Sequence, residues 1–244
     1  MNYKRRLILA ACVVLTTALV VVSCVSPAKE HLNIGNKHFD QGRYDEAIVE
    51  YTKAIELAPQ FARAFNNRGL AYHKKGELDK AIADFDKAIE LDPLRAEVYY
   101  NRGSVYSDRG QFQSAIADYD KAVVLDPRFV MAYNNRGLAY AGQVQFDRAI
   151  ADYDKAIELD PKLAVAYDNR GIMYRNKGEF DKAIADFIKA IELDPGLAKA
   201  YFNRAYAYNK KGDVAQAKAD LDKCIQISTD PELTKAAKQL LERL

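Results

Sequence analysis

Asparagine recurs every 34 residues along most of the chain, in a row that could make the same hydrogen bond many times over. The six members are Asn33, Asn67, Asn101, Asn135, Asn169 and Asn203. A side-chain amide donates through its nitrogen and accepts through its oxygen. A row of such amides can therefore hold the main chain of an extended peptide, whatever the sequence of that peptide. The chemistry that these residues indicate is binding.

Residues suited to catalysis or metal binding form no comparable set. His31 and His38 occupy places where the later 34-residue segments carry aromatic residues, and no cysteine near them would complete a zinc site. Carboxylates recur with the same period and do not form one distinct pair. The sequence has no nucleophile elbow, phosphate-binding loop or metal motif. Cys224 takes the place of a small buried residue, which predicts an inert thiol. We expect no catalytic residue, no metal site and no cofactor.

The first 24 residues differ from everything after them. A basic cluster at 4–6 precedes an apolar run at 7–22, as in a signal for export. The run ends before Cys24 in a context that resembles the bacterial lipoprotein signal, in which the cysteine is diacylated. We expect a signal peptide at 1–23 and a lipid on Cys24, which anchors an exported protein facing the periplasm or the cell exterior. A single-pass membrane anchor and a freely secreted form are the alternatives.

The composition excludes two classes of protein. Lys plus Arg number 36 and Asp plus Glu number 34, so the basic footprint of a nucleic-acid-binding protein is absent. The three cysteines are too few for a disulfide framework. We expect a protein or peptide partner, and no nucleic acid.

The asparagines belong to a longer pattern with the same period. Proline falls at 34-residue intervals from Pro59 to Pro195. Counted from residue 28, positions 8, 20 and 27 of each repeat are small, and positions 11 and 24 are aromatic in most copies. Such spacing lets helices approach closely while rings fill the grooves between them. A period of this length indicates stacked two-helix units that cannot bury their apolar faces alone. The pattern resembles the tetratricopeptide repeat (TPR) family over residues 28–230.

The resemblance implies an all-α fold, a right-handed superhelical solenoid of antiparallel helix pairs. We expect a short tether at 24–27, followed by six units at 28–61, 62–95, 96–129, 130–163, 164–197 and 198–230. Asp230 suits a helix N-cap and Pro231 the first helical position, which predicts a capping helix at 231–244. Glycine marks the turn inside five units. In the fourth, Val144 takes that place and Gly142 comes two residues earlier, so we expect a distorted turn there.

In the TPR family the asparagine position faces the concave groove, so the resemblance places the six asparagines there. More variable groove positions hold Leu70, Leu138, Ile172 and Tyr206, which favours a ligand with hydrophobic side chains. Two other interpretations stay open: the asparagines brace neighbouring units, and some of the apolar residues pack between repeats. The family's carboxylate clamp for acidic C-terminal tails is not matched, because its lysine and arginine places hold Leu32, Glu97 and Asn101.

Charged residues also recur with the repeat. Position 7 is arginine in units two to six, and position 23 is acidic in all six. We expect a solvated charged face, with a ladder of ion pairs between helices as the alternative. Exposed pairs contribute little to stability.

These features together predict a non-enzymatic, membrane-anchored adaptor that holds a peptide or protein partner in its groove. Its layout is similar to that of bacterial TPR lipoproteins that help to assemble cell-envelope complexes. A self-associating module, which forms a homo-oligomer through the apolar groove, is the alternative class. An enzyme is disfavoured because no set of reactive residues stands apart from the repeat.

Overall fold

A computed structural model describes residues 26–244 of the chain. This part consists of 13 α-helices and contains no strand, as the all-α prediction requires. In chain order the helices are α1 (Pro27–Asp40), α2 (Tyr44–Leu57), α3 (Ala62–Lys74), α4 (Leu78–Leu91), α5 (Ala96–Asp108), α6 (Phe112–Leu125), α7 (Val130–Gly142), α8 (Phe146–Leu159), α9 (Ala164–Asn176), α10 (Phe180–Leu193), α11 (Ala198–Lys211), α12 (Val214–Ile227) and α13 (Pro231–Leu241). The predicted signal peptide and Cys24 lie outside the described residues.

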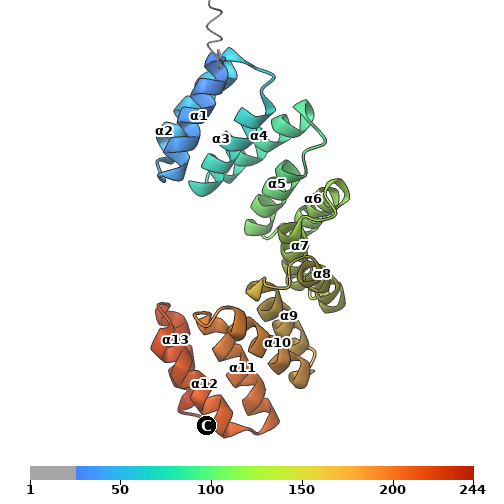
Figure 1. The fold of residues 1–244 in the computed structure, drawn as a ribbon, viewed down its shortest axis with the longest axis vertical. Helices are drawn as coiled ribbons and strands as arrows, with labels where there is room; N and C mark the ends of the chain where they lie inside the picture. The colour runs from blue at the N-terminus through green and yellow to red at the C-terminus, as the bar shows by residue number, and fades with distance from the viewer. Residues whose placement is uncertain (1–25) are drawn as a thin grey trace, which may run out of the picture.

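The first twelve helices form six pairs that stack into a curved solenoid (Figure 1). Each helix packs against the next one along the chain. The odd-numbered helices, which we term first helices, also contact the first helices of neighbouring units. No comparable contact joins the second helices, α2 to α12, of neighbouring units within residues 26–244. The first helices therefore lie on the shorter, inner side of the curve, and Figure 1 shows α5 and α7 on that side of α6 and α8.

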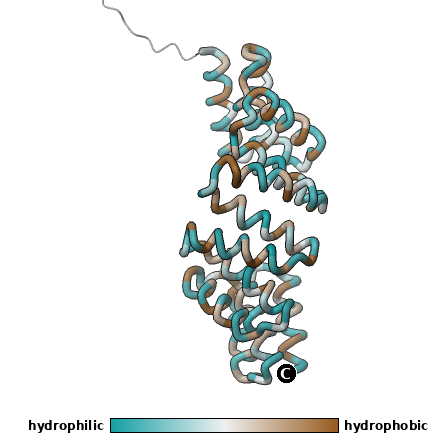
Figure 2. Tube along the Cα trace, turned by 90° about the vertical axis from the view of Figure 1, so that its right-hand side faces the viewer, coloured by the Kyte–Doolittle hydropathy of each residue, from teal (hydrophilic) through white to brown (hydrophobic). Residues whose placement is uncertain are grey.

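The helices are amphipathic, so the hydrophobic core is a series of buried clusters between successive helices along the solenoid. Figure 2 shows hydrophilic and hydrophobic residues alternating along each helix of the tube. Apolar residues at helical spacing place one stripe of each helix against its neighbours. None of the helices in the described part of the chain is long and apolar enough to cross a membrane.

A glycine opposite an aromatic ring sets the close approach within each of the first five units. At Gly69, for example, an added Cβ atom would lie 2.8 Å from the ring of Phe85. In the sixth unit the glycine is replaced by Ala205 and the ring by Leu221, both fully buried. The larger residue at position 8 thus accompanies a smaller one at position 24. Alanines at positions 20 and 27 are also fully buried, as the sequence pattern predicts.

The turn inside the fourth unit keeps the geometry of the others, so the predicted distortion is wrong. Five turn glycines have φ between 71° and 83°, and Val144 adopts the same left-handed conformation with φ 61°. Its N–H donates to the carbonyl of Ala141 at 2.9 Å, the bond that Gly110 makes to Ser107 in the third unit. Left-handed backbone is unfavourable for a β-branched residue. The turn therefore keeps the backbone conformation of the other units at the cost of local strain at Val144.

The last helix covers the end of the stack. The carboxylate of Asp230 accepts hydrogen bonds from the N–H groups of Glu232 and Leu233 at 2.9 and 3.3 Å, and Pro231 begins α13. Ala237 is fully buried against the sixth unit, in a cluster that includes Cys224. An N-cap bond of this kind satisfies main-chain donors that the helix itself leaves unpaired.

Candidate binding groove

The six asparagines of the sequence pattern all lie on first helices, one per unit. Asn33 is on α1, and the others follow on α3, α5, α7, α9 and α11. They therefore form a row along the inner side of the solenoid. Asn33 is exposed, whereas Asn203 at the other end of the row is buried.

The amide nitrogens of this row bind the preceding unit. Five asparagines donate to a polar side chain one repeat earlier, at distances between 2.8 and 3.2 Å. The acceptors are Asn36, Asn66, Tyr100, Asn134 and Asp168, in chain order. Each bond of this kind contributes about 0.5–1.5 kcal/mol net. The asparagines thus brace neighbouring units, and Asn33 belongs to the first unit of the described residues.

The side-chain oxygens of the row differ in whether they accept a hydrogen bond within the protein. Those of Asn67 and Asn135 accept from the adjacent asparagine at 3.0 Å, and that of Asn203 accepts from Arg175 at 2.7 Å. The oxygens of Asn101 and Asn169 accept no hydrogen bond from residues 26–244. These two acceptors, with Asn33, are the members of the row that remain available to main-chain N–H groups of a ligand.

The four apolar groove residues of the sequence pattern differ in how far they are exposed. Leu138 is 43% exposed, whereas Leu70 and Ile172 are partly buried against neighbouring core clusters. The charged groups of Arg175 and Lys210 each lie over the ring of Tyr206, 5.4 Å from its centroid. Leu138 is therefore the member most accessible to a ligand.

Two further apolar side chains extend this surface, and the sequence analysis missed them. Met131 and Val165 are 38% and 41% exposed. Each lies seven residues before a predicted groove residue, Leu138 on α7 and Ile172 on α9, and therefore on the same helix face. The signal was present in the sequence as apolar residues at position 2 of units four and five. We call Met131, Leu138, Val165 and Ile172 the apolar strip.

A cavity of about 250 Å³ lies between the first two units. It is lined by two apolar residues, Phe39 and Leu70, and by Asn36, Asp40, Tyr51 and Asn67. The hydroxyl of Tyr51 donates to Asn36 at 2.9 Å, so the polar wall is fixed by hydrogen bonds within the protein. The structure thus brings one predicted asparagine and one predicted apolar residue into a single recess.

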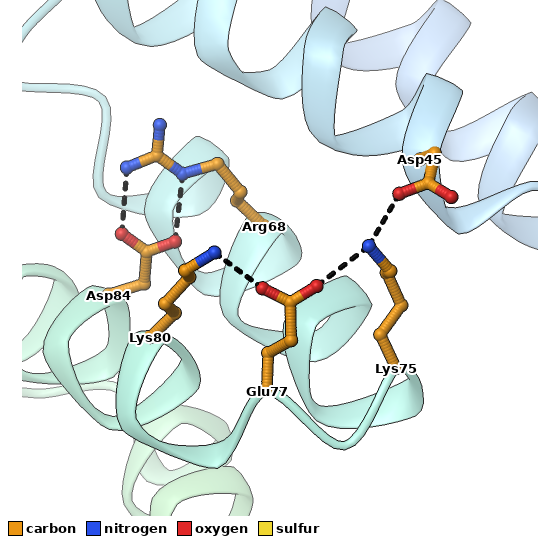
Figure 3. Close-up of polar contacts among 6 residues, drawn as sticks. All are labelled: Asp45, Arg68, Lys75, Glu77, Lys80 and Asp84. Carbon is orange, nitrogen blue, oxygen red and sulfur yellow. Dashed lines mark hydrogen bonds and ion pairs between the residues drawn. The ribbon is translucent and has the colours of Figure 1, made fainter.

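Charged residues form buried ion pairs, which makes the predicted solvated face wrong. Arg68 donates through Nε and Nη2 to both carboxylate oxygens of Asp84, each at 2.8 Å, as Figure 3 shows. The same two-bond pairing recurs in the next four units, at Arg102–Asp118, Arg136–Asp152, Arg170–Asp186 and Arg204–Asp220. The five aspartates are buried. Paired charges of this geometry are stronger than ordinary hydrogen bonds.

The same arginines also link one unit to the one before. Nη1 of Arg102, for example, donates to Asp86 at 2.5 Å. Burial alone would lower the pKa of Arg102, but its bonds to Asp118 and Asp86 outweigh burial, so the pKa is raised. The sequence pattern predicted pairs between positions 7 and 23, whereas the part that the acid at position 25 plays was not predicted. In the fifth unit that position is Ile188, so Arg204 lacks this link.

A second row of contacts crosses between units at the turns. Lys75 lies 2.5 Å from Asp45, as Figure 3 shows for this pair. Lys177 lies 2.6 Å from Asp147, and the residues of each pair are 30 positions apart. In the fourth unit both partners are neutral, and Gln143 donates to Gln113 at 3.3 Å. The charges at these two positions thus change together, a signal that the sequence carries.

The described residues hold no cluster of histidine, cysteine and acidic side chains able to bind a metal ion. The imidazole of His31 is held within the protein, because its Nδ1 lies 2.6 Å from a carboxylate oxygen of Glu50. Cys224 is buried, and burial raises the pKa of its thiol, which disfavours the reactive thiolate.

The fold and this inner surface define the protein as a helical-repeat solenoid. A family model described as TPR repeat matches residues 35–76, 103–144 and 171–212. Models described as tetratricopeptide repeat match 62–93 and 130–163, 85–117 and 152–185, and 198–231. The chain therefore belongs to the tetratricopeptide repeat family.

Solved structures of this family resemble the chain along most of its length. MamA is 33% identical with a TM-score of 0.62, and the match covers 68% of this chain and 97% of MamA. YrrB, described as a TPR protein with an unusual peptide-binding site, is 31% identical with a TM-score of 0.62, over 78% of this chain and 97% of YrrB. A search of curated protein sequences finds no match.

Two more distant structures share the fold over a longer stretch. PilW, described as a type IV pilus biogenesis factor, is 21% identical with a TM-score of 0.77, over 86% of this chain and 97% of PilW. PilF of Pseudomonas aeruginosa is 16% identical with a TM-score of 0.77, over 87% of this chain and 97% of PilF. At these identities the likeness concerns the fold alone.

Proposed function

We propose that this chain is a non-enzymatic scaffold that binds an extended peptide segment of a protein partner along the inner side of the solenoid. The observation that carries the proposal is the apolar strip, because Met131, Leu138 and Val165 are all more than a third exposed on first helices. Exposed apolar side chains that gather on one concave surface mark binding sites more often than isolated ones do. YrrB, at 31% identity, has a peptide-binding site according to its description, which supports the same class of ligand.

Hydrogen bonds to the ligand main chain would come from part of the asparagine row. Asn101 and Asn169 each keep a carbonyl oxygen available, and Asn33 is exposed. A net contribution of about 0.5–1.5 kcal/mol for each bond leaves most of the affinity to side chains. The recess beside Leu70 and the apolar strip are the places where apolar side chains of the ligand would be buried.

Binding to a library of displayed dodecapeptides tests this proposal. The full chain with Leu138→Asp should lose at least tenfold in affinity for peptides selected on the wild type, because the variant places a charge in the strip. Val124→Asp is the matched control, since Val124 is 70% exposed but lies on the second helix α6. Equal effects of the two substitutions would contradict the proposal.

The N-terminal segment supports a membrane tether for this scaffold. A basic cluster at 4–6, an apolar run at 7–22 and Cys24 have the order of a lipoprotein signal. A diacylated Cys24 would hold the solenoid close to a membrane surface, since α1 begins three residues later at Pro27. Labelling with a radioactive fatty acid tests it: the wild type should be labelled and Cys24→Ser should not. An unlabelled wild type that stays in the membrane fraction would favour a spanning anchor.

A further inference from the structure

Arg175 differs from every other partly buried arginine in residues 26–244. Each of the others makes an ion pair with an aspartate or glutamate: Arg68, Arg95, Arg102, Arg109, Arg136, Arg170 and Arg204. Arg175 is partly buried on α9 without such a pair. Burying an unpaired charge is costly, so a protein rarely keeps one without a partner.

Neutral groups fix the position of this guanidinium. Nη1 donates to the side-chain oxygen of Asn203 at 2.7 Å, and Nη2 donates to that of Asn176 at 3.2 Å. The ring of Tyr206 lies beneath it at 5.4 Å. A guanidinium has five N–H donors, of which these contacts use two. The group is therefore held in place while donors remain for another acceptor.

Asp168, an acid close enough to act on the charge of Arg175, does not serve as that acceptor. Asp168 lies seven residues earlier on the same helix face, and among the acids buried in residues 26–244 it is the one without an ion pair. Asn203 stands between the two charges, because its amide nitrogen donates to Asp168 at 3.2 Å while its oxygen accepts from Arg175. The arginines at position 7 contact their buried aspartates directly, in two bonds of 2.6–2.8 Å, and in the fifth unit Arg170 does so with Asp186. Arg175 is thus kept apart from Asp168 by the neutral side-chain amide of Asn203.

The charge around this site is positive. The positive charge of Lys199 is close enough to Asp168 to favour the charged form of its carboxyl. The ammonium group of Lys210 lies 5.4 Å from the centroid of the Tyr206 ring. Arg175 and these two lysines place three positive charges around Asp168 and Tyr206. Neither lysine has an ion pair among the described residues. An anionic ligand group is therefore favoured here, beside Ile172 of the apolar strip.

We propose that Arg175 binds the carboxylate of an aspartate or glutamate side chain in an extended peptide whose apolar side chains lie on the apolar strip. The inference rests on the proposed peptide-binding function and names the chemistry of the ligand. A planar guanidinium can grip both oxygens of a carboxylate, which a lysine cannot do. The site differs from the carboxylate clamp considered above, whose places in the first three units hold Leu32, Glu97 and Asn101.

Dodecapeptide selection on the full chain supplies the probe. Peptides selected on the wild type should be enriched in one acidic residue next to apolar residues. Replacing that Asp by Asn, or Glu by Gln, should weaken binding to the wild type about tenfold, because one charge-assisted pair is lost. This comparison uses unaltered protein and does not depend on how any variant folds.

Protein variants then assign the effect to one residue. Arg175→Gln should bind the acidic and amide peptides equally, and Arg175→Lys should keep only part of the preference. Arg128→Gln is the control, because Arg128 is exposed in the connection between α6 and α7 and should leave the preference intact.

Each remaining outcome separates this inference from the proposed function. Peptides that bind in the groove with no preference for an acid would overturn the role of Arg175 and leave the peptide-binding function standing. Failure to select any binding peptide would contradict both. Loss of the Arg175-dependent preference on amidation of the peptide C-terminus would assign the site to a chain end and would overturn the side-chain proposal.

Discussion

The ring of Tyr153 packs so closely on Gly137 that an added Cβ atom would lie 2.7 Å from it. Contacts of this kind recur in five units, and the sixth replaces the pair with Ala205 and Leu221. Gly137→Ala should therefore destabilise the protein by about 1–2 kcal/mol, since overpacking outweighs the better helix propensity of alanine. Urea unfolding followed by circular dichroism measures this change.

A double variant tests the cause of that destabilisation. Gly137→Ala combined with Tyr153→Leu copies the sixth unit, so the two substitutions should cost less together than the sum of the single costs. A coupling of about 1 kcal/mol is expected for residues in direct contact. Additive effects would show that the ring does not set the limit at Gly137.

The hydroxyl of Tyr153 is buried without a hydrogen-bond partner in the described part of the chain. In contrast, the hydroxyl of Tyr119 donates to Ser104 at 3.3 Å. Since an unsatisfied buried polar group costs about 1–3 kcal/mol, Tyr153→Phe should stabilise the protein by about 1 kcal/mol. Tyr119→Phe is the control and should not stabilise it. Urea unfolding followed by circular dichroism measures both variants. A destabilised Tyr153→Phe variant would mean that the hydroxyl has a partner.

Val144 holds a left-handed conformation that costs an L-residue roughly 1–2 kcal/mol. Its side chain is 69% exposed, so little packing is lost when it is removed. Val144→Gly should stabilise the protein by about 1 kcal/mol in thermal unfolding. The reverse change at the equivalent turn, Gly178→Val, should destabilise it by a similar amount. Equal midpoints for the two variants would argue against backbone strain at residue 144.

Burial raises the pKa of the Asp168 carboxyl above its ordinary value, and the hydrogen bond from Asn203 offsets only part of that effect. The folded protein therefore binds a proton at Asp168 at a higher pH than the unfolded chain does, and this group costs stability above its folded pKa. Asp168→Asn should be more stable than the wild type at pH 7. Its advantage should shrink as the pH falls through the folded pKa of Asp168 towards the ordinary aspartate value.

Urea unfolding of both proteins between pH 7 and pH 4 measures this difference. Asn134, which stands at the same position in the fourth unit, shows that an amide fits there. An advantage that stays constant with pH would mean that Asp168 does not change its protonation state differently on folding.

The fold could be predicted from the sequence because small and aromatic residues recur at the same positions in six repeats. Small residues such as Ala81 and rings such as Phe85 could be placed in the core from their spacing alone, and both are fully buried. The predicted distortion around Val144 failed for a local reason. Hydrogen bonds from the turn to the preceding helix hold that residue in the conformation that glycine adopts elsewhere.

The candidate site was harder to predict because its contacts join different units. The row that includes Asn101 was recognised, but the acceptor of each amide lies one repeat earlier and varies in type from Asn66 to Tyr100. The separation of Arg175 from Asp168 depends on the amide of Asn203, a side chain from the next unit. A single repeat therefore does not reveal it.

Photo-crosslinking from the two sides of the solenoid distinguishes a peptide bound along the first helices from one bound along the second helices. A benzophenone amino acid would replace Leu138 on the inner side or Val124 on a second helix in the full chain, with a selected dodecapeptide as the probe. Binding along the inner side predicts a peptide adduct from position 138 and none from position 124. An adduct from position 124 that equals or exceeds the one from position 138 would contradict it.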